Sequence, residues 1–265
     1  MDLTNNGERF TGLADLYAAS RPAVPEYPVK LLVSYLGHEP GTVVDLGCGP
    51  GISTAVWQGR CREVVGVEPN SDMVRAAREL YTEPGIRFVQ AFGHDTGLAD
   101  HSVDIVVSSQ AFQWMEPVST FAEIDRILVS GGIFATIDYE WPPMFNWKAE
   151  MIIRQFGKEL SALDEGREAN RGIVRWSKKD HIKHMQEAGI FRHIREAFFA
   201  SCQEYTAERL VGMALSHSSA RFVAEKYPEE SGKLIERFYH DLVSVLGNGV
   251  FPVEISYRLR IGVKR

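Results

Sequence analysis

The stretch VVDLGCGPG, residues 43–51, carries a short run of apolar and β-branched residues directly into three closely spaced glycines. Gly47, Gly49 and Gly51 allow the backbone to turn sharply and to approach a ligand, because a Cβ atom there would clash. The residues that follow, from about Ile52, read as a helix. A strand, a glycine loop and a helix in this order are typical of α/β folds, and they predict a ligand at the carboxyl end of the strand.

Two nucleotide-binding motifs fit this loop poorly. A dinucleotide site of the G-x-G-x-x-G type would place its third glycine at position 52, which is Ile52. A phosphate-binding loop of the Gly-Lys-Ser/Thr type needs a lysine, and none occurs between Lys30 and Lys148. The sequence therefore argues against nicotinamide, flavin and nucleoside triphosphate sites at this loop.

The sequence spacing between the glycine loop and the next acidic strand end is informative. Glu68 ends the run VVGVE and lies 21 residues after Gly47, the length of one helix and one strand. A carboxylate at that strand end can accept hydrogen bonds from both hydroxyls of a ribose. The alternative is an ordinary tight turn beside a surface acid, but the combined spacing favours a cofactor site.

Short β-branched runs alternate with helical stretches along the first half of the chain, which predicts a parallel sheet with helices on both faces. The runs cover residues 42–47, 63–68, 86–91, 103–109 and 132–139. Asn70 and Ser71 open one helix as caps. A second helix, over residues 118–129, is expected to stop at Gly131 and Gly132.

Two later segments add strands. Residues 191–201 read as a further strand, and residues 253–263 alternate apolar and polar side chains, which predicts an antiparallel strand with one buried and one wet face. The predicted fold is α/β: a doubly wound, mostly parallel seven-stranded sheet whose last strand is antiparallel, with a helical lid at the carboxyl edge. The predicted parts are cap helices (1–40), a cofactor-binding core (41–140), a lid that includes the strand near 191–201 (141–250) and the final strand (251–265).

Composition narrows the possible partners. The 265 residues carry a formal charge of −6, which disfavours nucleic acid as the main ligand. No apolar run approaches the roughly 20 residues that span a bilayer, and no secretory leader is recognisable. The three cysteines lack a C-x-x-C spacing, which argues against disulfides or structural zinc and favours the reducing cytoplasm. A monomer and a homodimer both remain open.

A metal site is not expected either. His181 and His184 share a helical face, but no neighbouring carboxylate or cysteine completes a ligand set. We interpret this pair as part of a solvated helix face.

The motifs resemble those of class I S-adenosylmethionine-dependent methyltransferases. VVDLGCGPG is similar to their first motif, and VVGVEPN, which contains Glu68, is similar to their acidic second motif. The resemblance implies S-adenosylmethionine as cofactor and S-adenosylhomocysteine as product. It also implies that Glu68 binds the ribose and that the glycine loop passes under the methionine part of the cofactor.

Three further segments extend the resemblance to methyltransferases of the trans-aconitate and ubiquinone-biosynthesis type. They are AFGHDTGLADHSVDIVVSSQAFQWMEP (91–117), DRILVSGGIFA (125–135) and FTGLADLYAASRPAVPEYP (10–28), which resembles an amino-terminal helix that closes over the cofactor. The implied cofactor-binding residues are Tyr17, Arg21, Asp45, Gly47, Cys48, Gly49, Gly51, Glu68, Pro69, Met73, Gly93, His94, Ser109, Gln110, Ala111 and Trp114.

Two positions depart from the family's pattern. His94 stands where relatives often carry an acid that faces the adenine amine; a neutral histidine can accept that hydrogen bond, or Asp95 can replace it. Phe92 stands where a small or acidic residue is common. Gln113 stands where relatives often carry a histidine before Trp114, so a histidine base is absent there.

Some cofactor assignments remain open between two interpretations. Asp45 either supports the loop by accepting backbone N–H groups or touches the ammonium of the cofactor. Arg21 either pairs with the methionine carboxylate or is a solvated charge before a proline. Cys48 is interpreted as a small filler residue in the loop.

The candidate substrate-binding residues are Gln113, Tyr139, Trp141, His217 and Arg221. Tyr139 and Trp141 can wall an apolar or planar acceptor or pack the lid onto the sheet. His217 and Arg221, four residues apart, can share a helical face and bind an anion or form only a polar face.

The predicted function is in-line methyl transfer to a small-molecule acceptor, with O-, N- and C-methylation unresolved and no catalytic residue identified. Alignment of the acceptor and exclusion of water suffice for this chemistry. The alternatives are a catalytically silent protein that binds the adenosyl ligand, and a methyltransferase acting on a protein.

Overall fold

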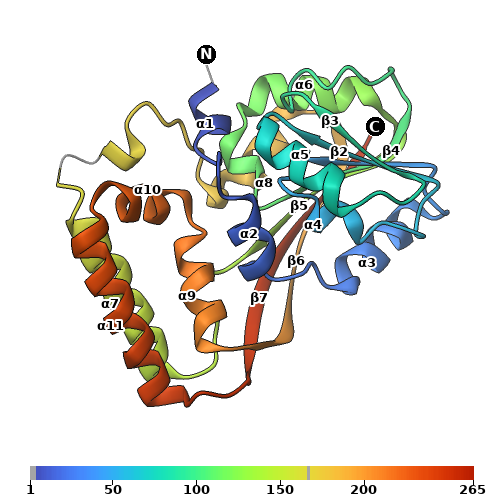
Figure 1. Ribbon diagram of the computed structural model, residues 1–265. Coiled ribbons are helices and arrows are strands. Elements are labelled where there is room, and N and C mark those ends of the chain that lie inside the picture. The colour runs from blue at the N-terminus through green and yellow to red at the C-terminus, as the bar shows by residue number, and fades with distance from the viewer. Residues whose placement is uncertain (1–3, 166–167) are drawn as a thin grey trace.

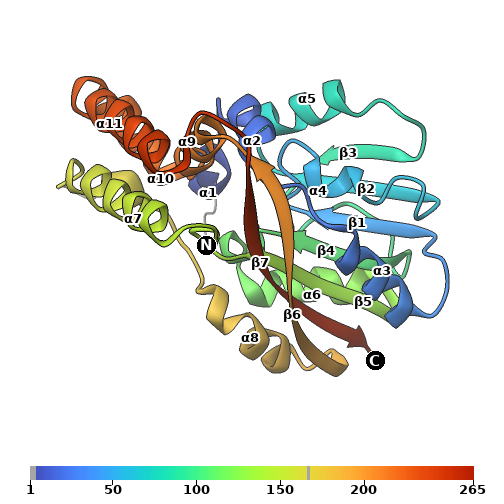
Figure 2. The same ribbon diagram turned by 90° about the horizontal axis from the view of Figure 1, so that it is seen from below.

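The computed structural model describes residues 4–165 and 168–265, which form one mixed sheet with helices packed on both faces (Figures 1 and 2). The sheet has seven strands in the order β3-β2-β1-β4-β5-β7-β6. The strands are β1 (Thr42–Leu46), β2 (Glu63–Glu68), β3 (Ile86–Gln90), β4 (Val103–Ser109), β5 (Leu128–Tyr139), β6 (Phe191–Tyr205) and β7 (Phe251–Lys264).

The predicted sheet topology is confirmed. Strands β1 to β5 pair in parallel, and β7 lies antiparallel between β5 and β6. The carboxyl ends of β1, β2 and β4 therefore meet at one edge of the sheet, where ligands bind in open α/β folds.

Strand β7 corrects one expectation. Its apolar series, which includes Ile255, Leu259 and Ile261, is buried as expected, but Arg260 on the opposite face is only 2% exposed. That face is not wet because α8 (His181–Ala188) packs against β6 and β7. The guanidinium is neutralised there by Asp138 of β5, whose Oδ2 lies 2.8 Å from Arg260 Nη1.

Helices cover both faces of the sheet (Figure 2). On one face, α3 (Glu26–Leu36) packs its apolar side against β4 and β5. On the other, α6 (Pro117–Ile127) and α8 enclose an aromatic cluster of Phe112, Phe121, Phe134 and Phe191. The short α4 (Ile52–Ala55) follows the glycine loop, and α5 (Ser71–Leu80) packs over β2 and β3.

The ends of two helices test the sequence interpretation. The Asn70 side chain accepts the Met73 backbone N–H and caps α5, as predicted. Helix α6, however, ends at Ile127, and Gly131 and Gly132 lie within β5. The two glycines occupy an irregular part of the strand: Gly131 has φ 78°, and a Cβ atom on Gly132 would lie 2.9 Å from the Val129 carbonyl oxygen.

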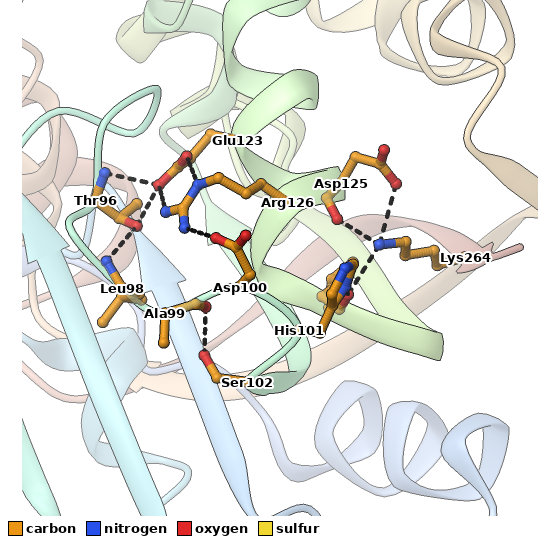
Figure 3. A network of polar contacts seen from close by, with 11 residues as sticks. Thr96, Leu98, Ala99, Asp100, His101, Ser102, Glu123, Asp125, Arg126 and Lys264 are labelled. Atoms are coloured by element: carbon orange, nitrogen blue, oxygen red, sulfur yellow. Dashed lines mark hydrogen bonds and ion pairs between the residues drawn. The ribbon is translucent and has the colours of Figure 1, made fainter.

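Polar contacts fix the loop between β3 and β4 onto α6 (Figure 3). Arg126 forms ion pairs with Glu123 and Asp100, and Glu123 accepts hydrogen bonds from the backbone N–H and the hydroxyl of Thr96. Burial would raise the pKa of the Glu123 carboxyl, but the bonds from Arg126 and Thr96 lower it to about 2. The loop is thereby held at the ligand-binding edge of the sheet.

Four helices gather beyond the end of β6 and β7 (Figure 1). They are α7 (Trp147–Ala162), α9 (Ala207–Leu215), α10 (Ser218–Lys226) and α11 (Pro228–Leu246). Phe156 of α7 stacks on Phe238 of α11 at 4.1 Å between ring centroids. Near the amino terminus, α1 (Thr4–Glu8) is followed by α2 (Ala14–Ser20), which packs on α9. The division of the chain into a cap, a core and a lid stays a prediction.

Among the residues that the structure describes, no helix combines the length and the apolar character needed to cross a membrane.

Candidate cofactor and acceptor pocket

A cavity lies at the carboxyl edge of β1, β2 and β4 and is lined on one side by the amino-terminal segment. Segments far apart in the sequence line it: residues 6–21, the glycine loop, residues 68–73, 92–94, 109–115, 170–178 and 217–219. Most of the predicted cofactor-binding residues share this one cavity. Those that line it are Tyr17, Arg21, Gly47, Gly49, Glu68, Pro69, Met73, Gly93, His94, Ser109, Gln110, Ala111 and Trp114.

The three loop glycines have positive φ angles but different surroundings. Gly49 has φ 55°, and a Cβ atom built on it would meet no atom within 4 Å, since it would point into open space. A Cβ atom on Gly47 would lie 2.4 Å from the Ala111 Cβ, and one on Gly51 would lie 2.9 Å from the Phe88 ring. Only Gly47 and Gly49 line the cavity; Gly51 and Cys48 lie behind it.

Glu68 is held at the cavity wall by backbone donors. One carboxylate oxygen accepts the Gly49 N–H and the other accepts the Asn70 N–H, both at 3.0 Å. Burial raises the pKa of this carboxyl to about 7, although the two N–H donors oppose the shift. Each oxygen keeps a further acceptor site, so the carboxylate can also take hydroxyl donors from a ligand.

Asp45 lies behind the loop and does not line the cavity. Its Oδ2 accepts hydrogen bonds from the Ser53 hydroxyl at 2.6 Å and the Thr54 hydroxyl at 2.8 Å. Burial raises the pKa of this carboxyl to about 6. Asp45 thus fastens the start of α4 to β1, through side-chain hydroxyls rather than through the expected backbone N–H groups.

The segment after β4 forms the floor of the cavity. Gln110 has φ 58°, an uncommon angle for a residue other than glycine. Its side-chain oxygen accepts from Lys178 Nζ, and its backbone oxygen accepts from Gln113 Nε2 at 2.6 Å. The Gln113 side-chain oxygen is buried and has no partner among residues 4–165 and 168–265, so it remains available to a ligand.

Aromatic and apolar groups line the side of the cavity next to Glu68. Pro69 and Met73 follow β2, and Gly93 and His94 follow β3. The His94 ring stacks on Phe92 with 5.4 Å between ring centroids. Asp95, the alternative partner for an adenine amine, does not line the cavity.

The amino-terminal segment closes the cavity. Arg21 donates to the Ser216 carbonyl at 3.0 Å, and its guanidinium lies 4.6 Å from the Tyr17 ring centroid. Asn6 donates to the carbonyl oxygens of Trp114 and Val174 and accepts the Val174 N–H. One side chain therefore joins three segments that are far apart in the sequence.

The predicted acceptor residues are dispersed. Gln113 and His217 line the cavity, whereas Tyr139 lies outside its lining, buried against Tyr257. Trp141 packs on the His217 ring at 5.1 Å and borders a neighbouring cavity that also reaches Ile153 and Phe156 of α7.

Arg221 lines neither cavity and pairs with Glu225 of its own helix at 2.7 Å. The expected anion site shared with His217 does not form. His217 is the N-cap of α10 and its backbone oxygen accepts the Arg221 N–H, but its ring packs on Trp141 while Arg221 turns to Glu225.

His181 also differs from the expectation of a solvated pair. It is fully buried, in contact with the Phe112 ring, and its Nδ1 lies 3.4 Å from Asp138 Oδ2. The solvated interpretation is wrong for His181 because α8 turns His181 and Met185 together toward the sheet. Within the described ranges, no group of three or more His, Cys, Asp or Glu side chains is arranged to hold a metal.

Comparison with known proteins agrees with this architecture. Residues 44–136, from β1 to β5, match the family described as "Methyltransferase domain". This part of the chain is a class I S-adenosylmethionine-dependent methyltransferase domain. Both the predicted family and the predicted fold are confirmed.

Two curated relatives match the methyltransferase domain. A probable S-adenosylmethionine-dependent methyltransferase of Saccharomyces cerevisiae is 35% identical over 44% of this chain and 43% of its own length. The trans-aconitate 2-methyltransferase of an Azoarcus species is 38% identical over 36% of this chain and 37% of its own. The chain thus matches less than half the length of either relative.

Solved structures show the same fold around the methyltransferase domain. A protein of Anaeromyxobacter dehalogenans, described as a type II methyltransferase, superposes with a TM-score of 0.67 over 92% of this chain and 97% of its own, at 18% identity. A phosphoethanolamine N-methyltransferase of Haemonchus contortus superposes with a TM-score of 0.56 over the whole chain and 60% of its own, at 14% identity.

Sequence reasoning missed several residues around the cavity. Asn6, Arg9 and Phe10 line it from the amino terminus, and Arg175 and Lys178 line it from the segment before α8. Phe10 begins the stretch 10–28 that carries part of the resemblance, but no motif marks Asn6, Arg9 or the segment before α8. The available signal was composition alone, a cluster of basic residues between 171 and 179.

Proposed function

We propose that this protein transfers the methyl group of S-adenosylmethionine to a small-molecule acceptor and releases S-adenosylhomocysteine. The observation that carries the proposal is that Glu68 and the open side of Gly49 face one cavity, joined by a hydrogen bond. A buried carboxylate with free acceptor sites suits a ribose, and the space above Gly49 suits a close ligand backbone. The methyltransferase family match over residues 44–136 supports the same assignment.

In this proposal, different residues of the cavity bind different parts of the cofactor. Glu68 accepts the ribose hydroxyls, and Gly47 and Gly49 lie under the methionine part. Arg21 binds the methionine carboxylate, since its buried Nε has no partner within the described ranges. The adenine lies against His94. The other residues that would contact the cofactor are Tyr17, Pro69, Met73, Gly93, Ser109, Gln110, Ala111 and Trp114, with Asp45, Cys48 and Gly51 supporting the loop from behind.

The bound cofactor supplies a methyl carbon that is already electrophilic, so the protein's own groups align the acceptor and exclude water. Gln113 and His217 are the predicted acceptor residues that line the cavity. Tyr139 and Trp141 lie behind this lining, Trp141 against the His217 ring, and Arg221 lies outside it. We assign no catalytic residue.

The names of relatives leave the acceptor open. The trans-aconitate 2-methyltransferases are named for a small acid, and another relative is a malonyl-[acyl-carrier protein] O-methyltransferase. We propose a small-molecule acceptor for this chain in the cytoplasm, with a monomer or homodimer acting without nucleic acid or membrane. A protein acceptor and a silent binding protein are the alternatives.

The proposal is tested by binding and by turnover. We expect calorimetry to show that the chain binds S-adenosylhomocysteine. The Glu68→Ala variant should bind it with about 30- to 150-fold lower affinity, because two charge-assisted hydrogen bonds are removed. Glu63→Ala, on the exposed start of the same strand, is the matched control and should bind normally. Label transfer from methyl-labelled cofactor to a metabolite panel separates an enzyme from a silent binding protein. Unchanged affinity of Glu68→Ala would remove Glu68 from the site.

A further inference from the structure

Strand β6 forms the outer edge of the sheet, where it pairs with β7 (Figure 2). Outside β7, a single hydrogen bond reaches its backbone in the part of the chain that the structure describes: Arg209 Nη1 donates to the Glu204 carbonyl oxygen at 2.8 Å. The strand is 15 residues long. Its outward N–H and C=O groups can therefore pair with another strand along most of its length.

The middle of this edge lacks the groups that usually prevent such pairing. Residues 197–203, AFFASCQ, contain no charged side chain and no proline. Edge strands that remain unpaired commonly carry lysine, other charges or proline at their centre. The charged residues of β6 lie to either side of this segment and are Arg192, Arg195, Glu196 and Glu204.

An aromatic ring projects from the uncharged segment into solvent. Phe198 is 65% exposed, although the Arg258 guanidinium of β7 lies 5.1 Å from its ring centroid. Cys202, on the same face of the strand, is also exposed. The opposite face is fixed to the protein, because the Phe199 ring stacks on Tyr257 with 5.0 Å between ring centroids. The segment is thus held in place from one side while Phe198 stays uncovered on the other.

The charges along β6 suit an antiparallel pairing of two identical strands. If Phe198 of each copy lies opposite Phe198 of the other, Arg195 faces a serine and Glu196 faces Ala200, so that no like charges are opposite one another. A pairing centred on Ala200 would instead place Glu196 opposite Glu204. The charge pattern therefore favours the register centred on Phe198.

We propose that β6 is the surface through which two copies of this chain form a dimer. The copies pair antiparallel along residues 193–203 about a two-fold axis at Phe198, and the two seven-stranded sheets become one continuous sheet. Each Phe198 ring is then covered by the other, and a two-fold axis makes the same patch serve on both copies. Of the described residues, none in β6 lines the cofactor cavity, so the inference is independent of the proposed function.

Sedimentation velocity on the full chain tests the surface. We expect a dimer at roughly 100 µM protein, a concentration at which a complex with a micromolar Kd is formed. Phe198→Glu should weaken the dimer at least about tenfold, because two carboxylates would lie directly opposite each other. In the separate chain the new carboxylate lies beside Arg258, so the variant should fold, which circular dichroism checks.

Trp147→Glu is the matched control, because Trp147 of α7 is 67% exposed and lies on a different surface. It should leave the dimer intact. If the unmodified chain is a monomer at this concentration, or if Trp147→Glu dissociates the dimer as much as Phe198→Glu does, the inference is overturned.

Cross-linking tests the register. Residues directly opposite in an antiparallel pair lie about 4.5–5.5 Å apart between Cα atoms, within reach of a disulfide. Phe198→Cys in a Cys202→Ser background should therefore form an interchain disulfide on oxidation. The native Cys202 residues lie four positions to either side of the axis, about 26 Å apart, and should not be linked. A dimer that is linked through native Cys202, or not linked through Phe198→Cys, would overturn the pairing.

Discussion

Two parts of the cavity lining, called its two ends below, hold opposite charges and are built in different ways. At one end, the Glu68 carboxylate accepts two backbone N–H groups from a loop and a helix start that directly follow parallel strands. At the other end, Arg9 and Arg175 meet at Trp114, and their segments are joined through the side chain of Asn6. The sheet itself positions the first end, whereas the second depends on side chains that bridge distant segments. The first end is therefore fixed by the fold, whereas the second end is adaptable because it depends on side-chain contacts.

The largest effect is expected from filling the space at the fixed end. Gly49→Val should abolish S-adenosylhomocysteine binding in calorimetry, because the side chain would enter the open space above the loop and φ 55° disfavours any Cβ. Gly59→Val is the matched control: Gly59 has φ 69°, also has open space around it, and lies outside the cavity. It should carry a similar backbone strain yet still bind. Retained binding by Gly49→Val would show that the ligand does not approach this loop.

A second prediction addresses the counter-ion beneath the cationic end. Asp138 is 3% exposed and lies between Lys178 and the nearly buried Arg260. Burial would raise the pKa of its carboxyl, but the contacts with His181 and Lys178 lower it to about 2. Asp138→Ala should therefore lower the free energy of unfolding by about 3–5 kcal/mol, since it leaves the buried Arg260 with only the partly exposed Glu196, 3.2 Å from its Nε, as counter-ion.

Chemical denaturation measures this loss. Asp125→Ala removes the carboxylate that pairs with Lys264, which lies on the same strand as Arg260. Asp125 is about half exposed and Lys264 keeps the carbonyl oxygens of residue 125 and Leu128 as acceptors, so the expected loss is below about 1 kcal/mol. Equal losses for the two variants would contradict the role given to Asp138.

The fixed end could be predicted from the sequence because its parts are local. One strand, one loop, one helix and a second strand place Glu68 beside Gly49, and parallel pairing allows little variation in that distance. The antiparallel β7 was equally accessible, because its strict alternation appears in the sequence itself. Burial of Arg260 on its other face was not, since it requires Asp138 and α8 from elsewhere in the chain.

The cationic end could not be predicted in the same way. Arg9 and Arg175 lie 166 residues apart, in segments with no hydrophobic periodicity. The pair chosen instead, His217 and Arg221, relied on helical spacing, which joins their backbones but does not show that the His217 ring packs on Trp141 and that Arg221 pairs with Glu225. His181 was misassigned for a related reason: a polar residue next to lysines reads as exposed until the face on which the helix packs is known.

A third prediction uses the charge of Glu68. Its pKa of about 7 in the free protein means that the carboxyl is largely protonated below pH 7. Ribose hydroxyls donate best to the charged carboxylate, so binding releases a proton. Affinity for S-adenosylhomocysteine should therefore rise from pH 5 to pH 7, by at most about tenfold per unit, and level off above pH 8.

The same shift acts on stability with the opposite sign. The folded-state pKa is raised above the ordinary value near 4.5, so the contribution of Glu68 to stability is fully present below pH 4.5 and is lost as the pH rises through 7.

The Glu68→Gln variant tests the pH dependence of binding. It should flatten the pH profile of S-adenosylhomocysteine affinity measured by calorimetry. A profile unchanged in that variant would assign the titration to another group.

The smallest expected effect concerns motion at the join between the two ends. Residues 8–24 carry Arg9, Tyr17 and Arg21 along one side of the cavity. Ligand contacts with Arg21 remove open states of this segment, so its amide hydrogen exchange should slow several-fold when S-adenosylhomocysteine is added. Helix α11, which does not line this cavity, is the internal control and should exchange at an unchanged rate.

Arg21→Ala should weaken S-adenosylhomocysteine binding and remove the protection, whereas Trp141→Ala should leave both intact because Trp141 borders only the neighbouring cavity. Loss of cofactor binding in a folded Trp141→Ala variant would show that the neighbouring cavity is coupled to the cofactor site and that the two cannot be treated separately.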